Sequence, residues 1–423
     1  MPDQIACGID FGTSNSTCAI ADARGARLVP LEGDHVTLPS AIFFHSSGHI
    51  LFGREATRAY VEGDDGRLMR GLKTILGTSL MEERTLVNSR TRSFTDILSI
   101  YIRNLKDKAE AFSERNIERV ILGRPVHFHD NDPGADTKAH QILEDIAKSV
   151  GFKDVEFQYE PIAAAFSHEQ NIEGEKLSLV IDLGGGTSDF TVIRLSEQRR
   201  GVADRASDVL ATTGIRVGGT NFDKSLSLKT FMPFFGLGSE FRGRFDSDKI
   251  LTVPLTVYSQ LSDWAKVYQA QTPRSIRETK DILSTALAPE KIERLLMVQE
   301  RQLGHALLHA VERTKIALTE KDRVPADVSD FNQSVRLFVT RKEFESAIKT
   351  DLQRIKMALD ECLQQAGVTK EQIELVILTG GSTELPVVSR MVTTYFPEAQ
   401  ISSGHKFDSV GLGLAYQAFY NQS

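Results

Sequence analysis

Two hydrophobic periodicities alternate along this chain. Short apolar runs predict strands, and longer segments with apolar residues at every third or fourth position predict amphipathic helices. In the first part of the chain, residues 5–20 predict a strand, a hairpin turn and a second strand, and Thr95–Phe112 carries the apolar stripe of a helix. Further strands are expected at 28–30, 41–44, 119–123 and 155–158, with helices at 135–150 and from Glu160-Pro161, where proline suits a first helical turn.

The same alternation continues from residue 177 to the end of the chain. A long amphipathic helix is predicted over Phe344–Ala366, with Gly367 ending it. Strands are expected at 177–182, 190–195 and 375–379, and helices from near Pro386 and over Val410–Phe419. Repeated strand–helix units in two halves indicate an α/β fold with mixed sheets and a central cleft. We expect a first lobe over residues 1–170, to which a C-terminal helix at 405–423 returns, and a second lobe over 171–404.

An enlarged helical subdomain is expected at 224–311, within the second lobe. Its pattern is helical, without a cluster of catalytic side-chain types. Phe231–Phe235 and Trp264 supply large aromatic side chains, and we favour them as the core of a small lobe. The alternative is that they form an exposed docking surface for a protein partner.

Three glycine-bearing turns, each directly after an apolar run, carry the candidate chemistry: Gly8–Asn15, Ile181–Asp189 and Val376–Thr383. In the first two, a strand ends in Asp10 or Asp182, and Gly and Thr then bend the chain into another apolar strand. Glycine lets a ligand approach backbone N–H groups closely. These N–H groups and the Thr and Ser hydroxyls suit phosphate oxygens, and each Asp suits a hydrated divalent cation. Two such hairpins predict a duplicated fold that holds a nucleoside triphosphate from both sides.

One glycine-rich hairpin alone would be weak evidence, because tight turns account for most of them. The repetition of the pattern makes it specific. The other common nucleotide motifs are missing: no G-x-x-x-x-G-K-[ST] occurs, and Gly411-Leu412-Gly413 continues to Tyr416 where a dinucleotide fingerprint requires Gly or Ala.

Bulk properties exclude further classes of protein. The 423 residues allow two or three domains, and the net charge of −7 argues against nucleic-acid and acidic-membrane partners. The three cysteines lack metal-ligand spacing, and we expect Cys7 and Cys18 to be buried free thiols. The N-terminus does not resemble a signal peptide, and no apolar run approaches transmembrane length. These features favour a soluble, cytoplasmic protein.

Eight short segments, in order from Ile5 to about Tyr416, resemble the nucleotide-binding part of DnaK-type heat-shock chaperones, within the actin and sugar-kinase ATPase superfamily. A divergent, YegD-like member is the nearest resemblance. The segments are Gly8–Asn15, Gly71–Gly77, Val120–Phe128, Glu160–Ala165, Ile181–Asp189, Gly218–Asp223, Glu312–Leu318 and Leu378–Pro386. The resemblance implies an actin-like ATPase fold, with two duplicated, ribonuclease H-like lobes around a central cleft that binds ATP or ADP with Mg²⁺.

The resemblance also implies roles for residues at the phosphate end of the nucleotide. Asp10 and Asp182 would hold the magnesium ion through water, and Thr187 would offer its hydroxyl to the γ-phosphate. The turns would bind phosphates from both sides through Gly12, Thr13, Ser14, Asn15, Gly184, Gly185 and Gly186. Lys73 would supply positive charge to the transferred phosphoryl group, although an isolated loop Lys is usually solvated. Glu160 would orient the attacking water or a metal-bound water, the alternative being a simple helix-dipole role.

At the nucleoside end, the resemblance implies that Glu312 and Lys315 reach the ribose from one helix face. The alternative for this pair is a surface salt bridge. Gly380 and Gly381 would allow close approach of the adenosine, Ser382 would make a polar contact, and Asp408 lies where the family has an Asp in the nucleotide pocket.

The chain also departs from the family pattern. Ile316 and Glu384 stand where the family places Arg side chains on the adenine, so we expect weak base selectivity. The segments 223–312 and 125–151 are longer than their counterparts, and the Arg that acts with the family's switch Pro has no clear match, His140 being nearest. The chain ends at Ser423 without the linker and client-binding β-sandwich, so we expect no substrate-binding domain.

These features together predict a chaperone-like protein that binds Mg-ATP and hydrolyses it slowly, with opening and closing of the lobes as its output. A protein partner is expected through residues 224–311. The alternatives are a nucleotide-binding scaffold without turnover, a small-molecule kinase of the same fold, and an actin-like filament protein.

Overall fold

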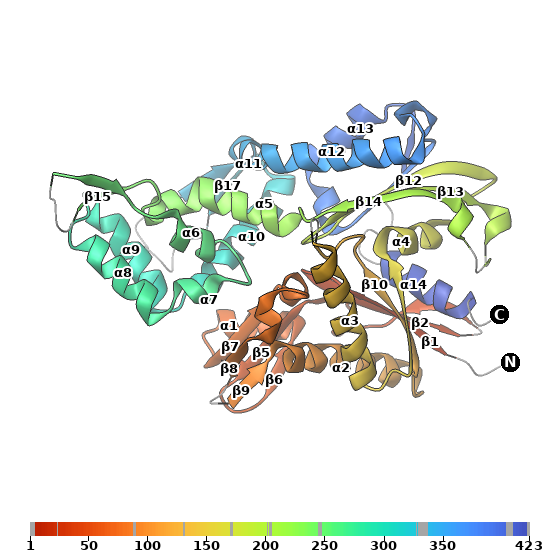
Figure 1. Cartoon of the computed structure of the whole chain (residues 1–423), viewed down its shortest axis with the longest axis horizontal. Coiled ribbons are helices and arrows are strands. Elements are labelled where there is room, and N and C mark those ends of the chain that lie inside the picture. The colour runs from red at the N-terminus through yellow and green to blue at the C-terminus, as the bar shows by residue number, and fades with distance from the viewer. Residues whose placement is uncertain are drawn as a thin grey trace. The chain divides into compact units, whose positions relative to one another are not determined.

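Two compact units make up the fold of this protein, seen here in a computed structural model (Figure 1). The structure describes residues 5–22, 24–87, 90–129, 132–169, 172–200, 202, 205–243, 248–326, 328, 337–402 and 409–420. The first unit takes the described residues up to Gly219 and from Gln353 onward, and the second takes Thr220–Leu352. The lobe boundary expected near residue 170 falls inside the first unit, and the division into two lobes remains a prediction.

A six-stranded mixed sheet in the first unit contains the first glycine turn. Its strand order is β11–β10–β1–β2–β3, with β4 paired to β2. The strands are β1 (Ala6–Phe11), β2 (Asn15–Asp22), β3 (Gly25–Leu28), β4 (Thr37–Pro39), β10 (Arg119–Arg124) and β11 (Asp154–Tyr159). β1 is antiparallel to β2 and parallel to β10, which confirms the strand–hairpin–strand predicted at 5–20. β3 starts earlier than predicted, because Gly25, at a φ of 100°, already pairs with Asp22.

A five-stranded mixed sheet in the same unit repeats this plan around the second glycine turn. Its order is β14–β13–β12–β19–β20. The strands are β12 (Glu175–Leu183), β13 (Ser188–Ser196), β14 (Val209–Ile215), β19 (Leu375–Thr379) and β20 (Gln400–Ser402). β12 is antiparallel to β13 and parallel to β19, as β1 is to β2 and β10. The fold is therefore α/β with two mixed sheets of matching plan.

Two helices pack against one another, α4 (Glu160–Glu169) and α14 (Ser409–Tyr420) (Figure 1). α4 also packs on strands of both sheets, and α14 packs on the six-stranded sheet. One buried core joins residues of the two sheets and of these helices, among them Ala6, Ile121, Ala163, Val180, Ile193 and Leu414. The packing of α14 on β1 and β2 confirms that the C-terminal helix returns to the first half of the chain. Gly413 allows this close approach, since a Cβ there would lie 1.7 Å from the carbonyl oxygen of Ala163.

The remaining elements of the first unit surround these two sheets. A three-stranded sheet has the order β6–β5–β7, and α1 packs on it. The short 3-10 helix η1 (Leu72–Ile75), which contains Lys73, follows β7. The other elements are β5 (Ala41–His45), β6 (Ile50–Phe52), α1 (Gly53–Val61), β7 (Gly66–Arg70), η2 (Ser79–Glu82), β8 (Arg84–Val87), β9 (Arg90–Ser93), α2 (Phe94–Ser113), α3 (Pro133–Ser149), η3 (Glu197–Arg199), η4 (Ala206–Asp208), η7 (Lys370–Gln372), η8 (Gly381–Glu384) and α13 (Pro386–Tyr395).

The single long helix predicted over Phe344–Ala366 is wrong. The segment forms two helices, α11 (Arg341–Ala347) and α12 (Lys349–Ala366), which the non-helical backbone of Ile348 separates. Thr340 starts α11 earlier than predicted, because its hydroxyl accepts the Glu343 N–H in a capping box. The fully buried Ile348 continues the apolar spacing across the break, so the sequence pattern did not reveal it.

The second unit is helical, with two small hairpins that the sequence pattern did not predict. Its elements are α5 (Gly219–Leu226), η5 (Ser227–Phe231), η6 (Met232–Phe235), β15 (Glu240–Arg242), β16 (Ile250–Thr252), α6 (Leu255–Leu261), α7 (Val267–Ala270), α8 (Pro273–Leu283), α9 (Pro289–Glu300), α10 (Gly304–Glu320), β17 (Arg323–Ala326), β18 (Leu337–Thr340) and α11. Phe231 and Phe235 are fully buried, and Trp264 is only 8% exposed. The core interpretation is confirmed for these three aromatics, and the surface for a partner remains unassigned.

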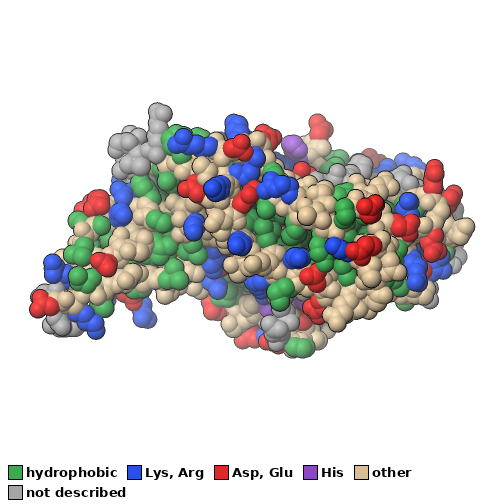
Figure 2. Space-filling model, turned by 90° about the horizontal axis from the view of Figure 1, so that it is seen from above, with side chains coloured by type: hydrophobic (Ala, Val, Ile, Leu, Met, Phe, Trp, Pro, Cys, Tyr) green, Lys and Arg blue, Asp and Glu red, His purple; other side chains and the backbone are tan. Residues whose placement is uncertain are grey.

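The surface and the cysteines agree with the bulk composition. Lys, Arg, Asp and Glu side chains are interspersed on the face that Figure 2 shows. Cys7, Cys18 and Cys362 are buried and free, as predicted for the first two. No helix among the described residues combines the length and the apolarity that a bilayer span requires.

Replacing Gly413 by Ala should destabilise the first unit. The new Cβ would overlap the backbone carbonyl of Ala163, which cannot rotate away, so we expect a loss of about 1–3 kcal/mol in the free energy of unfolding. Gly411→Ala in the same helix is the control, because its Cβ would lie 2.7 Å from the Thr17 hydroxyl, at the end of a side chain that can turn. Urea unfolding checks both variants, and equal midpoints would contradict the packing described here.

Candidate functional site

The first and second glycine turns contact one another within the first unit. A Cβ on Gly185 would lie 2.3 Å from Ser14 Oγ, and one on Gly186 would lie 2.6 Å from Thr13 Oγ1. Only glycine permits this approach of the second turn to the side chains of the first. The structure thus brings together these four residues, which the sequence assigned to phosphate binding from opposite sides.

Hydrogen bonds hold the backbone of each turn. In the first, Ser40 Oγ donates to Gly12 O at 2.7 Å, and Ser40 N donates to Ser14 O at 2.8 Å. In the second, Gly184 N donates to Thr187 O at 3.0 Å, and Gly184 O accepts from Gly219 N at 3.0 Å. Both turns are therefore built into the sheets before any ligand arrives.

The third turn packs directly behind the second. Ser382 Oγ donates to Gly184 O at 3.1 Å. Gly380 has a φ of 81°, and a Cβ there would lie 2.4 Å from Leu183 O and 2.7 Å from Asp182 Oδ1. Gly380 and Ser382 are thus placed beside Asp182, and Gly381 begins η8.

A buried cluster of charges lies at the ends of these strands. Lys73 Nζ and Glu160 Oε1 are 2.5 Å apart, and both residues are 7% exposed. Burial and the charge of Glu160 raise the pKa of Asp10 to about 7 and the pKa of Asp182 well above its ordinary value. Burial lowers the pKa of Lys73, but the charges of Glu160 and Asp10 outweigh it and raise that pKa overall.

Asp189 belongs to the same cluster, and the sequence analysis did not assign it a role. It lies opposite Asp182 in the β12–β13 register, and its Oδ1 accepts Val126 N at 2.8 Å. Burial and Glu160 raise the pKa of Asp189 to about 7. The sequence did contain a signal for this residue, because Asp189 stands at the far end of the second turn and matches Asp182 across the hairpin.

The cluster fits a hydrated divalent cation. Its four carboxyl groups share one ammonium, and when ionised they leave an excess of buried negative charge. Asp10 Oδ1 and Asp189 Oδ2 are buried without a hydrogen-bond partner among the described residues. Within those residues, no group of three or more His, Cys, Asp or Glu side chains converges on direct coordination of a metal ion.

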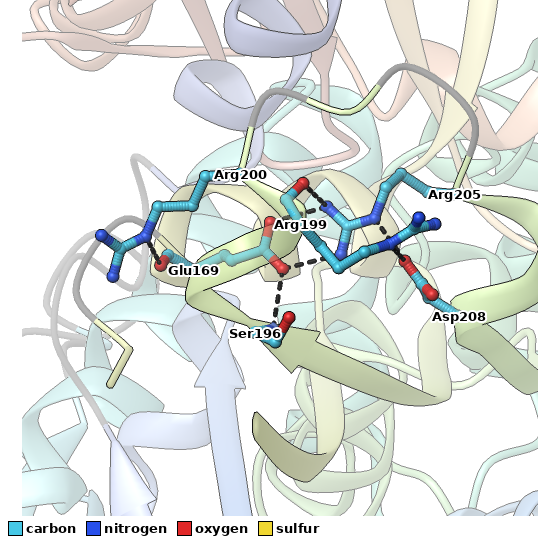
Figure 3. Close-up of polar contacts among 6 residues, drawn as sticks. All are labelled: Glu169, Ser196, Arg199, Arg200, Arg205 and Asp208. Carbon is cyan, nitrogen blue, oxygen red and sulfur yellow. Dashed lines mark hydrogen bonds and ion pairs between the residues drawn. The ribbon is translucent and has the colours of Figure 1, made fainter. Parts of the chain in front are cut away.

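The far end of α4, the helix that Glu160 begins, is anchored by a buried ion pair (Figure 3). Both guanidinium nitrogens Nη1 and Nη2 of Arg205 bond the carboxylate of Glu169, at 2.6 and 2.7 Å. Arg205 and Arg199 also bond Asp208, so the connection between β13 and β14 is tied to this end of the helix. Burial raises the pKa of Asp208, but the hydrogen bonds from these two arginines outweigh it and keep that pKa below its ordinary value.

Arg124, the last residue of β10, directly precedes Pro125 and bonds the segment that follows it. Arg124 Nη1 bonds His140 Nδ1 at 3.2 Å, Nη2 bonds Asp136 at 2.7 Å, and Nε donates to the carbonyl of Pro125. His140, the residue nearest to the expected position of the family's arginine, is thus a hydrogen-bond partner of Arg124.

Residues assigned to the nucleoside lie in both units. In the second, Lys315 Nζ is 2.9 Å from Asp223 Oδ1, so Lys315 is an ion-pair partner of α5 rather than a solvated side chain. Ile316 is 60% exposed on α10, which also carries Glu312. In the first unit Glu384 is exposed at the end of η8, and Asp408 lies outside the described residues. The nucleoside site remains a prediction.

Replacing Asp189 by Asn should make the nucleotide-free protein more stable at high pH. Wild-type Asp189 keeps its proton in the folded state up to about pH 7, whereas its ordinary pKa is 3.8. Its contribution to the free energy of unfolding therefore falls as pH rises through this window. The amide oxygen of Asn still accepts from Val126 N, so the advantage of the variant should be largest above about pH 7 and vanish toward pH 4.

Asp208→Asn is the matched control for this prediction, because its folded pKa is lowered instead of raised. Its ionised form stabilises the fold at every pH above the ordinary pKa, so the variant should be destabilised by a similar amount throughout the same window. Urea unfolding from about pH 5 to pH 8, without nucleotide or magnesium, measures both. A pH-independent effect of Asp189→Asn would show that this carboxyl is not protonated in the fold.

Comparisons with known proteins agree with this geometry. The model of the family "Hsp70 protein" matches residues 6–235 and 288–421. The unmatched residues 236–287 lie in the second unit, from the loop before β15 to the loop after α8. The chain is 26% identical to the "Chaperone protein DnaK" of Thermotoga petrophila and of Thermotoga maritima, with 97% of this chain and 58% of each relative covered. It thus spans less than two thirds of these relatives. The two duplicated hairpins, their facing glycine turns and the family match show that this chain belongs to the Hsp70 family.

Proposed function

We propose that this protein binds ATP or ADP with Mg²⁺ at the two facing turns and hydrolyses ATP slowly, as a chaperone-like nucleotide switch. The observation that carries this proposal is the contact between Gly185–Gly186 and Thr13–Ser14 directly beside the buried carboxyl cluster. Paired backbone turns supply N–H donors for phosphate oxygens, and the carboxyl cluster supplies the negative charge for a hydrated cation. Family membership supports the nucleotide and the cation.

Each turn would hold the phosphates through rigid backbone. Gly12–Asn15 would donate from the first sheet and Gly184–Gly186 from the second, with the Thr187 hydroxyl directed to the γ-phosphate. Asp10 and Asp182 would bind water molecules of the magnesium ion, which when bound neutralises charge on the β- and γ-phosphates. The two turns belong to different sheets, so their relative position would change with the nucleotide that is bound.

Lys73 and Glu160 would act as a pair during hydrolysis. The 2.5 Å ion pair holds the ammonium among carboxyl groups, where it would stabilise charge that develops on the transferred phosphoryl group. Glu160 and Asp189 would accept hydrogen bonds from the attacking water. With the water oriented by carboxylates alone, we expect a slow intrinsic rate, which suits a switch better than a metabolic enzyme.

The nucleoside would be bound more weakly than the phosphates. Ile316 can cover a purine face but carries no charge, and Glu384 offers no cation to stack on the base. A scaffold without turnover remains the second candidate. Ile316 and Glu384 favour it because they weaken base binding, whereas Lys73 and Glu160 favour hydrolysis.

A protein partner at 224–311 would have to contact residues other than the buried aromatics. Exposed apolar side chains of this segment lie on β16, at the start of α6 and before α9: Ile250, Leu251, Leu255 and Leu287. We propose these as the contact residues of such a partner.

Magnesium-dependent ATP binding should require both aspartates. At ligand concentrations about 100-fold above Kd, Mg-ATP should stabilise the wild type by about 2.7 kcal/mol. Asp10→Asn and Asp182→Asn should each remove about 1.4 kcal/mol or more of this ligand-induced gain, a tenfold loss of affinity. Asp22→Asn, at the other end of the same hairpin, is the control and should respond like wild type. A melting temperature that millimolar Mg-ATP leaves unchanged in wild type would disprove nucleotide binding at this site.

Lys73→Ala should slow turnover while ATP still binds. The lysine charge matters most in the transition state, so we expect kcat to fall by about 100-fold or more with Kd changed by less than about threefold. The control is Lys106→Ala, which removes another buried lysine, paired with Glu110 on α2. That variant should lose stability and keep its kcat. Phosphate release and calorimetry measure the two parameters, and an unchanged kcat in Lys73→Ala would remove this lysine from the mechanism.

A further inference from the structure

Two side chains tie down the segment that carries Lys73. Arg216 Nη2 donates to the carbonyl oxygen of Thr74 at 3.0 Å, and His129 Nε2 bonds the carbonyl oxygen of Leu76 at 2.6 Å. The two side chains also bond each other, with Arg216 Nη1 at 3.0 Å from His129 Nδ1. We call this pair, His129 and Arg216, the strap.

The chemistry of the partners sets the direction of every hydrogen bond in the strap. A carbonyl oxygen only accepts, so His129 Nε2 must donate to Leu76. A guanidinium only donates, so His129 Nδ1 must accept from Arg216. The bonds therefore run in one direction, from Arg216 through His129 to Leu76.

The segment is short, and its own backbone hydrogen bonds include Thr74 N to Gly71 O at 3.0 Å and Thr78 N to Ile75 O at 3.1 Å. η1 is a 3-10 helix of four residues, between Gly71 at a φ of 70° and Gly77 at a φ of 75°. Such short helices have poor hydrogen-bond geometry and few internal bonds. The start of α3 closes its other side, because a Cβ on Gly77 would lie 2.2 Å from Ala135 O. The carbonyls of Thr74 and Leu76 are two points, besides the Lys73–Glu160 ion pair, at which the rest of the unit holds it.

The strap also connects this segment with the second glycine turn. Arg216 follows β14 and stands two residues before Gly218, whose added Cβ would lie 2.8 Å from Gly184 O and from the carbonyl carbon of Gly185. His129 follows the Pro125 turn, in which Val126 N bonds Asp189. A shift of the second turn would therefore reach the Lys73 segment through Arg216.

We propose that His129 and Arg216 are positioning residues, which fix the Lys73 ammonium for phosphoryl transfer and couple it to the second glycine turn. This inference rests on the proposed ATPase function. Through their bonds to Thr74 and Leu76, both residues act on the reaction by way of the backbone of η1.

The kinetic test separates positioning from binding. His129→Ala and Arg216→Ala should each lower kcat for Mg-ATP hydrolysis by about tenfold, with KM within about twofold of wild type, because a misplacement of ~1 Å can cost ~100-fold in rate. The kcat of the double variant should lie within about twofold of the kcat of the slower single variant, since the two residues form one unit. His129→Gln keeps one donor and one acceptor and should recover most of the rate. The exposed His127→Ala and Arg194→Ala are the matched controls and should keep wild-type kcat.

Amide hydrogen exchange of residues 72–78 in the nucleotide-free protein gives a readout that needs no activity. Both strap variants should exchange there about tenfold or more faster than wild type, and the two controls should not. Faster exchange with unchanged kcat would make the strap a structural contact and overturn its positioning role. Unchanged exchange would overturn the strap itself. A wild type that hydrolyses no ATP refutes the proposed function and the positioning role together, and exchange still decides whether the strap holds the segment.

Discussion

An excess of buried negative charge is the constraint around which the first unit is organised. Asp10, Asp182 and Asp189 end or begin the strands of the two hairpins, and Glu160 begins the helix packed beside them. Only Lys73 offsets them among the charges named in this cluster, and the carboxyl pKa values rise accordingly. Buried charges persist in folded proteins when a ligand or ion compensates them, so this arrangement is costly alone and suited to a bound cation.

Glycine makes this arrangement possible. The carboxyl groups can share one region only because the two turns approach to within contact of each other, and a side chain at Gly185 or Gly186 would occupy the same space as Ser14 or Thr13. Similar close approaches occur where α14 crosses α4 at Gly413 and where Gly380 backs the second turn. These four glycines therefore mark places where the chain approaches itself too closely for a side chain.

Rigid and adjustable parts are separated within the first unit. The turns are built into two sheets and joined by the core of α4 and α14, whereas the Lys73 segment is a short 3-10 helix held by side chains from outside. Because those side chains come from loops next to the second turn, the lysine depends on the arrangement of the sheets. Slow hydrolysis and a response to the bound nucleotide would both follow from this dependence.

Local pattern predicted most of the elements. The hairpins at β1–β2 and β12–β13, the helices α2, α3, α4 and α14, and the strand β19 followed from apolar periodicity and from Gly and Pro, because these signals act within a few residues. The break at Ile348 was missed, since a buried residue at a helix end keeps the helical spacing. The small hairpins β15–β16 and β17–β18 were missed because strands of three or four residues leave too short a pattern.

The candidate site likewise has features that the sequence predicted and features that it did not. The sequence by itself determined which residue types could bind phosphate and a cation, because Asp, Gly, Thr and Ser recur in two matched turns. It did not determine that Lys315 pairs with Asp223, that Arg124 bonds His140, or that His129 and Arg216 meet at Thr74 and Leu76. The contacts of these residues join distant positions in the sequence. The separation is 12 residues for Arg124 and Asp136 and 142 residues for Arg216 and Thr74. Only tertiary packing brings such residues together, and contacts of this range leave no periodic trace in a single chain.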